Sequence, residues 1–268
     1  MKRFLTMTIW LATAALAAVA AAWAAGPPAD AVSCPAGADN PDASALVKRF
    51  EQLMRGQSMI GTVTMTVKKP SWSRTLKFKV WSQGKDYALV RILEGAASET
   101  GMMTLKREKQ LWNWLPQAGR LMKLPSGMMG DSWMGSDFTN DDLVNGSSLV
   151  DDFASKFEGP APQGGRAAWK ISLTPKPNAV VVWGRVELLI DRGNCDPLAE
   201  LFYDEDGKLV RTMTFGEYQK IGWRMMPMKI SVMPVEAGRE TTLTYSEAQF
   251  DVPVPASTFS LERLRQGR

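Results

Sequence analysis

The sequence predicts a mainly β protein built on one large antiparallel sheet that is curled or closed. From residue 62 onward, apolar side chains alternate with polar ones at a period of two, which is typical of strands with one covered face. Hairpin turns, such as Asp204-Glu205-Asp206-Gly207, separate these strands at regular intervals, and the sequence shows neither a βαβ alternation nor a fixed-period repeat. The pattern indicates about eleven strands and one clear helix.

The first 24 residues predict a signal peptide. Lys2 and Arg3 form a basic start, an apolar run extends from residue 4 to residue 22, and Ala22-Trp23-Ala24 supplies the small-x-small pattern that signal peptidase cleaves. A membrane anchor is the alternative, but a run composed mostly of alanine is only weakly hydrophobic. We therefore expect an exported protein that begins near residue 25.

Residues 25–41 are rich in Pro, Ala, Gly and Asp, and they predict a flexible linker. Asn40 and Pro41 then predict a helix start, with Asn40 as the N-cap and Pro41 at the first helical position. Apolar residues recur at helical spacing between residues 46 and 54, and Gly56 ends the run. An amphipathic helix of about four turns is expected here, at the start of a single folded domain that covers residues 42–268.

The strands after this helix are predicted from their alternation. Those around residues 62–67 and 75–80 alternate strictly, whereas residues 87–93 are apolar on both faces except for Arg91. Residues 102–107 and 110–115 form a hairpin that turns at Glu108-Lys109. Further strands are expected at residues 168–174, 180–191, 198–203, 208–218, 224–233 and 240–250.

Cys34 and Cys195 are the two cysteines of the chain. In an exported protein such a pair favours a disulfide, which here would tie the N-terminal tail to a strand. Two separate thiols are the alternative. Lipid attachment at Cys34 is not expected, because the preceding Ala31-Val32-Ser33 is a poor lipobox.

Several function classes are disfavoured by composition. The chain contains no histidine, which removes Ser-His-Asp and Cys-His catalysis and His-containing zinc sites. A hydrolase is the remaining enzymatic alternative, but no nucleophile–base pair can be named, so we expect no enzyme and no cofactor. Removal of Lys2 and Arg3 lowers the formal charge from +4 to +2, and no Arg/Lys cluster with interleaved aromatics predicts nucleic-acid binding.

One stretch, residues 111–150, interrupts the predicted strands. It is rich in Trp, Met, Gly and Asp, and suits neither a plain strand nor a plain amphipathic helix. Its first part is predicted to be a hairpin, formed by LWNWLP from residue 111 and RLMKL from residue 120. Its second part, residues 126–144, is predicted to be a lid in which glycines permit movement, with Thr139 capping a short helix that carries Asp141 and Asp142 in its first turn.

The acidic residues of this region do not predict a metal site. Counting from Asp131 or Asp137 does not give the ligand spacing and the glycine of a calcium loop. We expect these acids, together with Asp151 and Asp152, to lie at helix N-termini or to be solvated.

A curled sheet lined by Val, Leu, Phe, Met and Trp can enclose an apolar cavity, with the helix and the lid as its covers. Because a register shift of one residue exchanges inward and outward faces, the lining prediction depends on the strand register. Trp133→Ala is expected to weaken lipid binding more than it lowers thermal stability. The predicted lining residues are Val63, Met65, Phe78, Val80, Leu89, Trp112 and Trp114 from the strands, and Met128, Met129, Trp133 and Met134 from the lid.

Several motifs, in order along most of the chain, resemble the outer-membrane lipoprotein-sorting (LolA-like) family, in its TP-0789-like branch. They are LWNWLP from residue 111, Arg120 with Lys123, WMGSDFTNDDLV from residue 133, SLVDDF from residue 148, LTPKP from residue 173, YDEDGK from residue 203 and PASTFSLERL from residue 255. The resemblance implies an incomplete β-barrel of about eleven strands with helices that cap an apolar cavity.

The same resemblance implies a function. A periplasmic carrier would bind the acyl chains of lipids or lipoproteins and deliver them towards the outer membrane, with an RND-type exporter or an outer-membrane acceptor as partner. An RseB-like sensor or adaptor, which binds lipoprotein and regulates a membrane signalling protein or an RND exporter, is the alternative. The barrel arginine that holds the lid helices in relatives has no clear counterpart here, and Arg91 is the candidate only because it lies in an apolar strand.

Overall fold

The computed structural model describes residues 26–144 and 149–267, so the predicted signal peptide, residues 1–24, lies outside the described residues. Within these ranges no helix combines the length and the apolar character that crossing a membrane requires.

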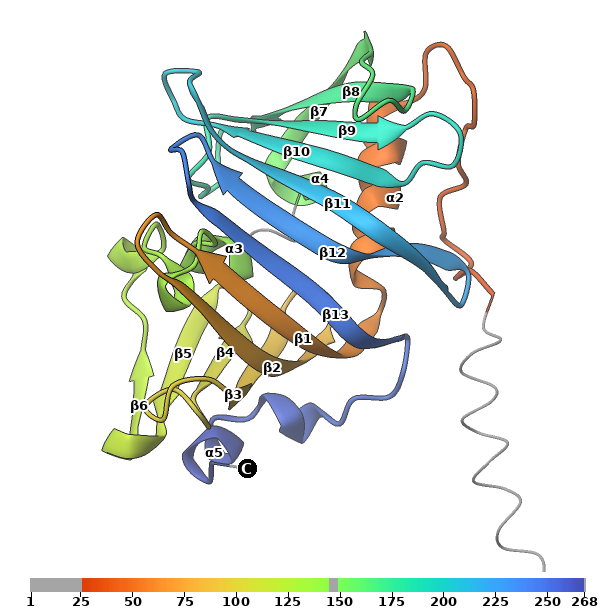
Figure 1. Cartoon of the computed structure of the whole chain (residues 1–268). Coiled ribbons are helices and arrows are strands. Elements are labelled where there is room, and N and C mark those ends of the chain that lie inside the picture. Colours follow the sequence, from red (N-terminus) through yellow and green to blue (C-terminus); the bar gives the residue numbers. More distant parts are fainter. Residues whose placement is uncertain (1–25, 145–148, 268) are drawn as a thin grey trace, which may run out of the picture.

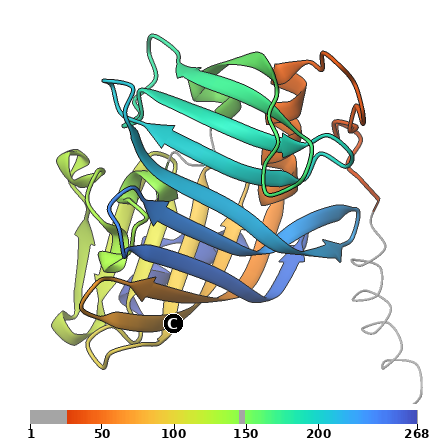
Figure 2. The ribbon, with the colours of Figure 1, turned by 45° about the horizontal axis from the view of Figure 1, so that its top comes forward.

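The described chain forms a 13-stranded antiparallel sheet that curls into an open half-barrel (Figure 1; Figure 2). The mainly β architecture predicted from the sequence is confirmed. The strands are β1 (Ser58–Lys68), β2 (Ser73–Gln83), β3 (Tyr87–Glu94), β4 (Met103–Arg107), β5 (Gln110–Leu115), β6 (Arg120–Lys123), β7 (Phe153–Pro160), β8 (Ala168–Pro175), β9 (Arg185–Asp191), β10 (Pro197–Tyr203), β11 (Leu209–Ile221), β12 (Arg224–Pro234) and β13 (Glu240–Phe250).

The sheet has 13 strands, whereas the alternation in the sequence predicts about eleven. One addition, β6, is the second arm of the LWNWLP–RLMKL hairpin. The other, β7, was not predicted. Its sequence, FASKFEGP, carries few large apolar residues, and only Phe153 within it is buried. An edge strand that buries so little gives a weak signal in the sequence.

The order of the strands decides where the cavity lies. Two meanders, β1–β6 and β7–β13, join through the pairing of β1 with β13, so the sheet runs β6-β5-β4-β3-β2-β1-β13-β12-β11-β10-β9-β8-β7. Its two free edges, β6 and β7, are consecutive in sequence. The chain between them therefore has to cross the open mouth of the half-barrel, and it does so with α3 (Asn140–Val144) and α4 (Leu149–Asp152) (Figure 1).

Helix α2 (Ala43–Arg55) packs on the concave face, against β7, β12 and α4 (Figure 1). It begins two residues later than predicted, at Ala43 instead of Pro41. Asp42, rather than Asn40, is the N-cap, because its carboxylate accepts hydrogen bonds from the N–H groups of Ser44 and Ala45. Gly56 ends the helix as expected, with a positive φ of 65°.

The disulfide between Cys34 and Cys195 is confirmed, with the two Cα atoms 5.7 Å apart. Cys195 lies in the turn between β9 and β10, so the bond ties the N-terminal segment to that turn. The same segment also contacts α2, since the Val32 N–H donates to Gln52 at 2.9 Å and Arg49 donates to the Val32 carbonyl at 2.6 Å.

The C-terminal segment covers the convex face of the first meander. The 3₁₀ turn η4 (Ala256–Phe259) and helix α5 (Leu261–Arg265) bury Phe259 and Leu264 against Leu89, Met103 and Leu105. Strand β3 is therefore largely apolar on both faces, whereas β4 turns the apolar Met103 and Leu105 to the C-terminal segment and the polar Thr104 and Lys106 to the interior of the half-barrel.

Candidate functional site

An apolar cavity of about 260 Å³ lies on the concave face of the sheet. Strands from both meanders form its walls, α2 and α4 cover it on one side, and residues 126–143, called the lid below, cover it on another. Aromatic side chains dominate the walls, among them Phe50 of α2, Phe202 of β10 and Phe215 of β11. A cavity with such walls offers an environment for hydrocarbon.

Four of the predicted residues line this cavity: Val63, Phe78, Val80 and Trp133. Met65 lies on the same face of β1 as Val63, is fully buried, and packs in the cluster that contains Trp133. On β1 and β2, alternation therefore places the inward face where we expected it.

Leu89, Trp112 and Trp114 lie away from the cavity, on the convex face. Leu89 pairs with Leu105 and Trp112 pairs with Leu105 from the other side, so the three side chains share one face of the sheet. They pack against the C-terminal segment. On β3 the residue that borders the cavity is Val90, the neighbour of the predicted Leu89.

The lid methionines lie outside the cavity wall. Met128 is exposed, Met129 is half-buried, and Met134 is half-buried against the cluster of Val63 and Trp133. None of these three methionines lines the cavity.

The second meander contributes cavity residues that were not predicted from the sequence. Its inward residues, Phe202, Met213, Phe215, Ile230 and Leu243, line half of the cavity. The signal was present, because each belongs to an alternating strand, but alternation does not show that two meanders face a common space.

The lid is a compact loop with its own hydrogen bonds. The Trp133 N–H donates to the Phe138 carbonyl at 2.8 Å, and the Ser136 hydroxyl donates to the Trp133 carbonyl at 2.7 Å. Met134 and Gly135, both at positive φ, make the tight turn between them. This turn points Trp133 inward, where its ring meets Phe78 edge to face at a centroid distance of 5.7 Å.

Trp133 has a second anchor. Its indole N–H donates to the Thr104 hydroxyl on β4 at 3.3 Å, and only 5% of the residue is exposed. Trp133 is therefore both a wall of the cavity and part of the core beneath the lid.

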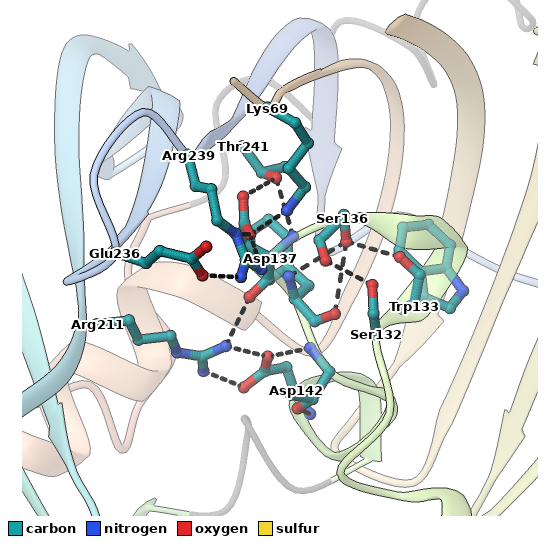
Figure 3. Close-up of polar contacts among 12 residues, drawn as sticks. Lys69, Ser132, Trp133, Ser136, Asp137, Asp142, Arg211, Glu236, Arg239 and Thr241 are labelled. Carbon is teal, nitrogen blue, oxygen red and sulfur yellow. Dashed lines mark hydrogen bonds and ion pairs between the residues drawn. The ribbon is translucent and has the colours of Figure 1, made fainter. Parts of the chain in front are cut away.

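Asp137 fastens the lid to the rim of the half-barrel (Figure 3). Its carboxylate accepts hydrogen bonds from Lys69 in the β1–β2 turn, from Arg239 beside the β12–β13 turn at 2.7 Å, and from the Thr241 hydroxyl at 2.8 Å. The Asp137 N–H donates in turn to the Thr241 hydroxyl at 2.9 Å. The expectation that this acid is solvated is wrong, because the loop turns its side chain into the rim, where three donors replace water.

The surroundings of Asp137 favour the ionised form of its carboxyl group. Burial alone would raise the pKa of Asp137, but hydrogen bonds from Lys69, Thr241 and Arg239 outweigh that effect and hold the pKa below its ordinary value. The carboxylate is therefore charged at neutral pH, as a latch of this kind requires.

A second contact joins the lid to β11. Arg211 donates to both carboxylate oxygens of Asp142, with one of the N–O distances at 2.7 Å, and to the Asp137 carbonyl at 3.0 Å (Figure 3). Its guanidinium lies over the rings of Phe202 and Trp183, with centroid distances of 4.3 and 4.5 Å. The pair is buried, since Arg211 and Asp142 side chains are only 3% and 11% exposed.

Asp142 also caps α3, as the sequence suggested. The Asp142 N–H donates to the Thr139 hydroxyl, and the Thr139 N–H donates back to the Asp142 carboxylate at 2.7 Å. One carboxylate thus orders the lid helix and holds it to the barrel. Arg91, the candidate from the resemblance, lies on the convex face with Leu89, whereas Arg211 contacts the lid.

The fold and the site define the class: an open half-barrel with an apolar internal cavity closed by a latched lid. The chain belongs to the family whose model is described as "Uncharacterized protein" and matches residues 84–266. No curated protein sequence matches the chain.

Three solved structures share the fold. A DUF1329 family protein from Desulfovibrio piger has a TM-score of 0.76 at 22% identity, over 83% of this chain and 97% of its own. A domain described as outer membrane lipoprotein-sorting, from Vibrio parahaemolyticus, has a TM-score of 0.73 at 20% identity, over 83% and 98%. A LolA superfamily protein from Nitrosomonas europaea has a TM-score of 0.71 at 20% identity, over 83% and 99%. The predicted LolA-like fold is confirmed.

Proposed function

We propose that the protein is a carrier that binds acyl chains of lipids or lipoproteins in its cavity and delivers them towards the outer membrane. The observation that carries this proposal is the apolar cavity of about 260 Å³ beneath a latched lid. Each buried methylene of an acyl chain contributes about 0.8 kcal/mol, so a chain can be held without any covalent step. The fold shared with a lipoprotein-sorting domain supports the same proposal.

The proposal also covers the compartment of the protein, its donor and acceptor, and the release of the lipid. The predicted signal peptide would export the chain to the periplasm, where a soluble carrier can shuttle between two membranes. The donor and the acceptor would be an RND-type exporter and an outer-membrane protein. Release would follow when such a partner engages the rim and the contacts of Asp137 and Asp142 are broken.

The first test is extraction of the protein from a periplasm, followed by native mass spectrometry. We expect lipid to co-purify with the protein. After delipidation, the protein should bind a fluorescent fatty acid analogue, and added natural lipid should displace that analogue. Absence of both bound lipid and binding of the analogue would refute the carrier function.

A matched pair of variants makes this test specific to the cavity. Val80→Phe adds a ring inside the cavity wall, whereas Val235→Phe adds the same ring at a site that is 59% exposed. Since an added ring in a packed site costs roughly 1–3 kcal/mol of stability, unfolding is measured alongside binding. We expect Val80→Phe alone to reduce lipid binding. Equal binding by both variants would show that the ligand lies elsewhere.

Transfer between membranes separates the carrier from the sensor. A carrier moves labelled lipid between two populations of vesicles at a rate proportional to protein concentration. A protein that binds lipid, transfers none, and forms a stable complex with one membrane protein would instead match the sensor alternative.

A further inference from the structure

Three acidic residues lie among the mostly apolar residues that line the cavity: Asp141 and Asp142 come from the lid, and Glu200 comes from the sheet. Glu200 lies on β10, with Leu188 of β9 and Met213 of β11 directly opposite on its two sides. Cross-strand partners point to the same face of a sheet, so the carboxyl group lies between two apolar neighbours. Only 8% of the residue is exposed.

Within the described part of the chain, no side chain or N–H group donates a hydrogen bond to the Glu200 carboxyl, and no ion pair includes it. Arg211 is the cation that acts electrostatically on Glu200, but its two terminal N–H groups donate to Asp142 and to the Asp137 carbonyl, and its Nε has no hydrogen-bond partner. Buried polar groups normally have partners, because an unpaired group costs free energy. A carboxyl group kept without a partner in the wall of a cavity indicates a partner that enters with the ligand.

The surroundings also fix the protonation state. Burial raises the pKa of Glu200 to about 8, with Arg211 lowering it and Asp142 raising it. Asp141, Asp142 and Tyr245 are the other titratable residues in the cavity wall. At neutral pH the group is therefore a carboxylic acid, which has one O–H to donate.

We propose that Glu200 is a polar subsite of the cavity and donates a hydrogen bond to the carbonyl oxygen of an acyl ester. The cavity then recognises the ester group at the head of a chain as well as the chain itself. This inference rests on the proposed function, because it names the chemical group that the carrier recognises in its cargo.

An ester suits this geometry better than an amine. A cationic headgroup would need an ionised carboxylate, and it would be repelled by Arg211, whose positive charge acts on Glu200. A neutral donor facing a neutral acceptor avoids the cost of burying a charge. An alkyl amine is accordingly the contrasting probe.

The test uses three probes of equal chain length: a fatty acid methyl ester, an alkane and an alkyl amine. Their affinities are measured by displacement of a fluorescent analogue from the full mature chain at pH 6.5. We expect the wild type to bind the ester roughly fivefold more tightly than the alkane, which is the range that one neutral hydrogen bond supplies.

Three variants assign that preference to Glu200. Glu200→Gln keeps an N–H donor and should keep the preference, whereas Glu200→Leu should bind both probes equally. Leu201→Met changes the next residue of β10, which points to the opposite face of the sheet and lies outside the cavity, and should also keep the preference. Equal ester-to-alkane ratios in the wild type and Glu200→Leu, or tightest binding of the amine, would overturn the inference.

A pH series supplies a readout that a packing role would not change. Above about pH 8 the wild-type carboxyl ionises and loses its proton, so its ester preference should disappear, while Glu200→Gln should be unaffected. A pH-independent ester preference in the wild type would refute the donor role. If neither ester nor alkane binds at any pH, the proposed function fails and this inference fails with it. If the alkane binds and the ester is not preferred, this inference alone fails.

Discussion

The contact between Arg211 and Asp142 gives the sharpest prediction. Asp142→Asn keeps the shape of the side chain but removes its charge and one acceptor oxygen. Arg211 is 3% exposed and would keep its place over Phe202 with no counter-ion. Removing one partner of a buried ion pair costs about 3–5 kcal/mol, because the remaining charge is left uncompensated.

The structure indicates which equilibrium this free-energy cost changes, local opening of the lid or global unfolding. The lid can leave the rim without disruption of strand pairing, since it joins the two edge strands and belongs to neither. Opening the lid lets water reach Arg211, so we expect Asp142→Asn to favour local opening over global unfolding. A cost of about 3 kcal/mol corresponds to roughly a 100-fold loss of hydrogen-exchange protection in residues 126–143.

Hydrogen exchange followed by mass spectrometry measures this directly, with β1 peptides as the internal reference. Asp151→Asn is the matched control, because Asp151 is also an acid near the lid but is 52% exposed and pairs with Lys85 at the surface. Such a surface pair contributes at most about 1 kcal/mol. Asp142→Asn combined with Arg211→Met should recover much of the protection, since no charge is then left unpaired. Unchanged protection of the lid in Asp142→Asn would refute the latch.

Three further predictions concern stability. Cys34→Ser should lower the free energy of unfolding by about 5 kcal/mol on the chain-entropy model, given the 161-residue separation, and urea unfolding of the reduced wild type should match the variant. Gly184→Ala should destabilise the protein because its Cβ would lie 2.3 Å from a backbone carbonyl oxygen, whereas Gly216→Ala meets nothing within 4 Å, so equal melting temperatures would contradict the steric argument. Trp133→Ala should cost about 3–5 kcal/mol of stability and also weaken lipid binding, whereas Met128→Ala, at a 42% exposed site, should change neither measurably.

The sequence predicted the fold better than the faces of its strands. On β1, Val63 alternates with threonines, so only one assignment of the covered face is possible. On β3, Leu89 and Val90 are both apolar, because the C-terminal segment covers the convex side while the cavity lies on the other. Alternation then carries no information about which face is inside. Trp112 was wrongly predicted to line the cavity for the same reason, because it packs against the C-terminal segment on the convex face.

The latch could not be predicted for a different reason. Asp137 and Asp142 follow the pattern of helix-capping and loop acids, and Asp142 does cap α3. Their ion pairs, however, reach Arg239 and Arg211, which are 102 and 69 residues distant in sequence. Alternation along β11 places Arg211 on the inward face with Met213 and Phe215, but it does not show which acid pairs with this arginine. Such pairs become visible only once the strand order is known.

The position of the lid, by contrast, follows from topology. The two edge strands are consecutive in the chain, so their connection has to lie across the mouth of the half-barrel. Trp133 enters the cavity wall and Asp142 reaches the rim from the same short segment. Any ligand that contacts Trp133 therefore acts on the lid, and lid opening acts on the ligand by the same free energy.

Lid opening is also expected to be coupled to the protonation of Glu200. In the closed state, burial and Asp142 both raise its pKa to about 8, whereas Arg211 lowers it. When the lid opens, water enters and Asp142 moves away, so each change brings the pKa of Glu200 back towards its ordinary value of 4.5. We therefore predict that the closed lid holds a proton that the open lid releases.

The sign of the pH dependence follows from that proton. A group whose pKa is raised in the closed state stabilises closure below its ordinary pKa, and this stabilisation declines as the pH rises towards about 8. We therefore expect hydrogen-exchange protection of residues 126–143, corrected for intrinsic exchange rates, to fall between pH 5 and pH 8 in the wild type and to stay flat in Glu200→Gln. Opening would also remove the O–H that holds an ester, so lid opening and loss of the polar contact would occur together. An equal pH dependence in the two proteins would show that Glu200 does not sense the lid.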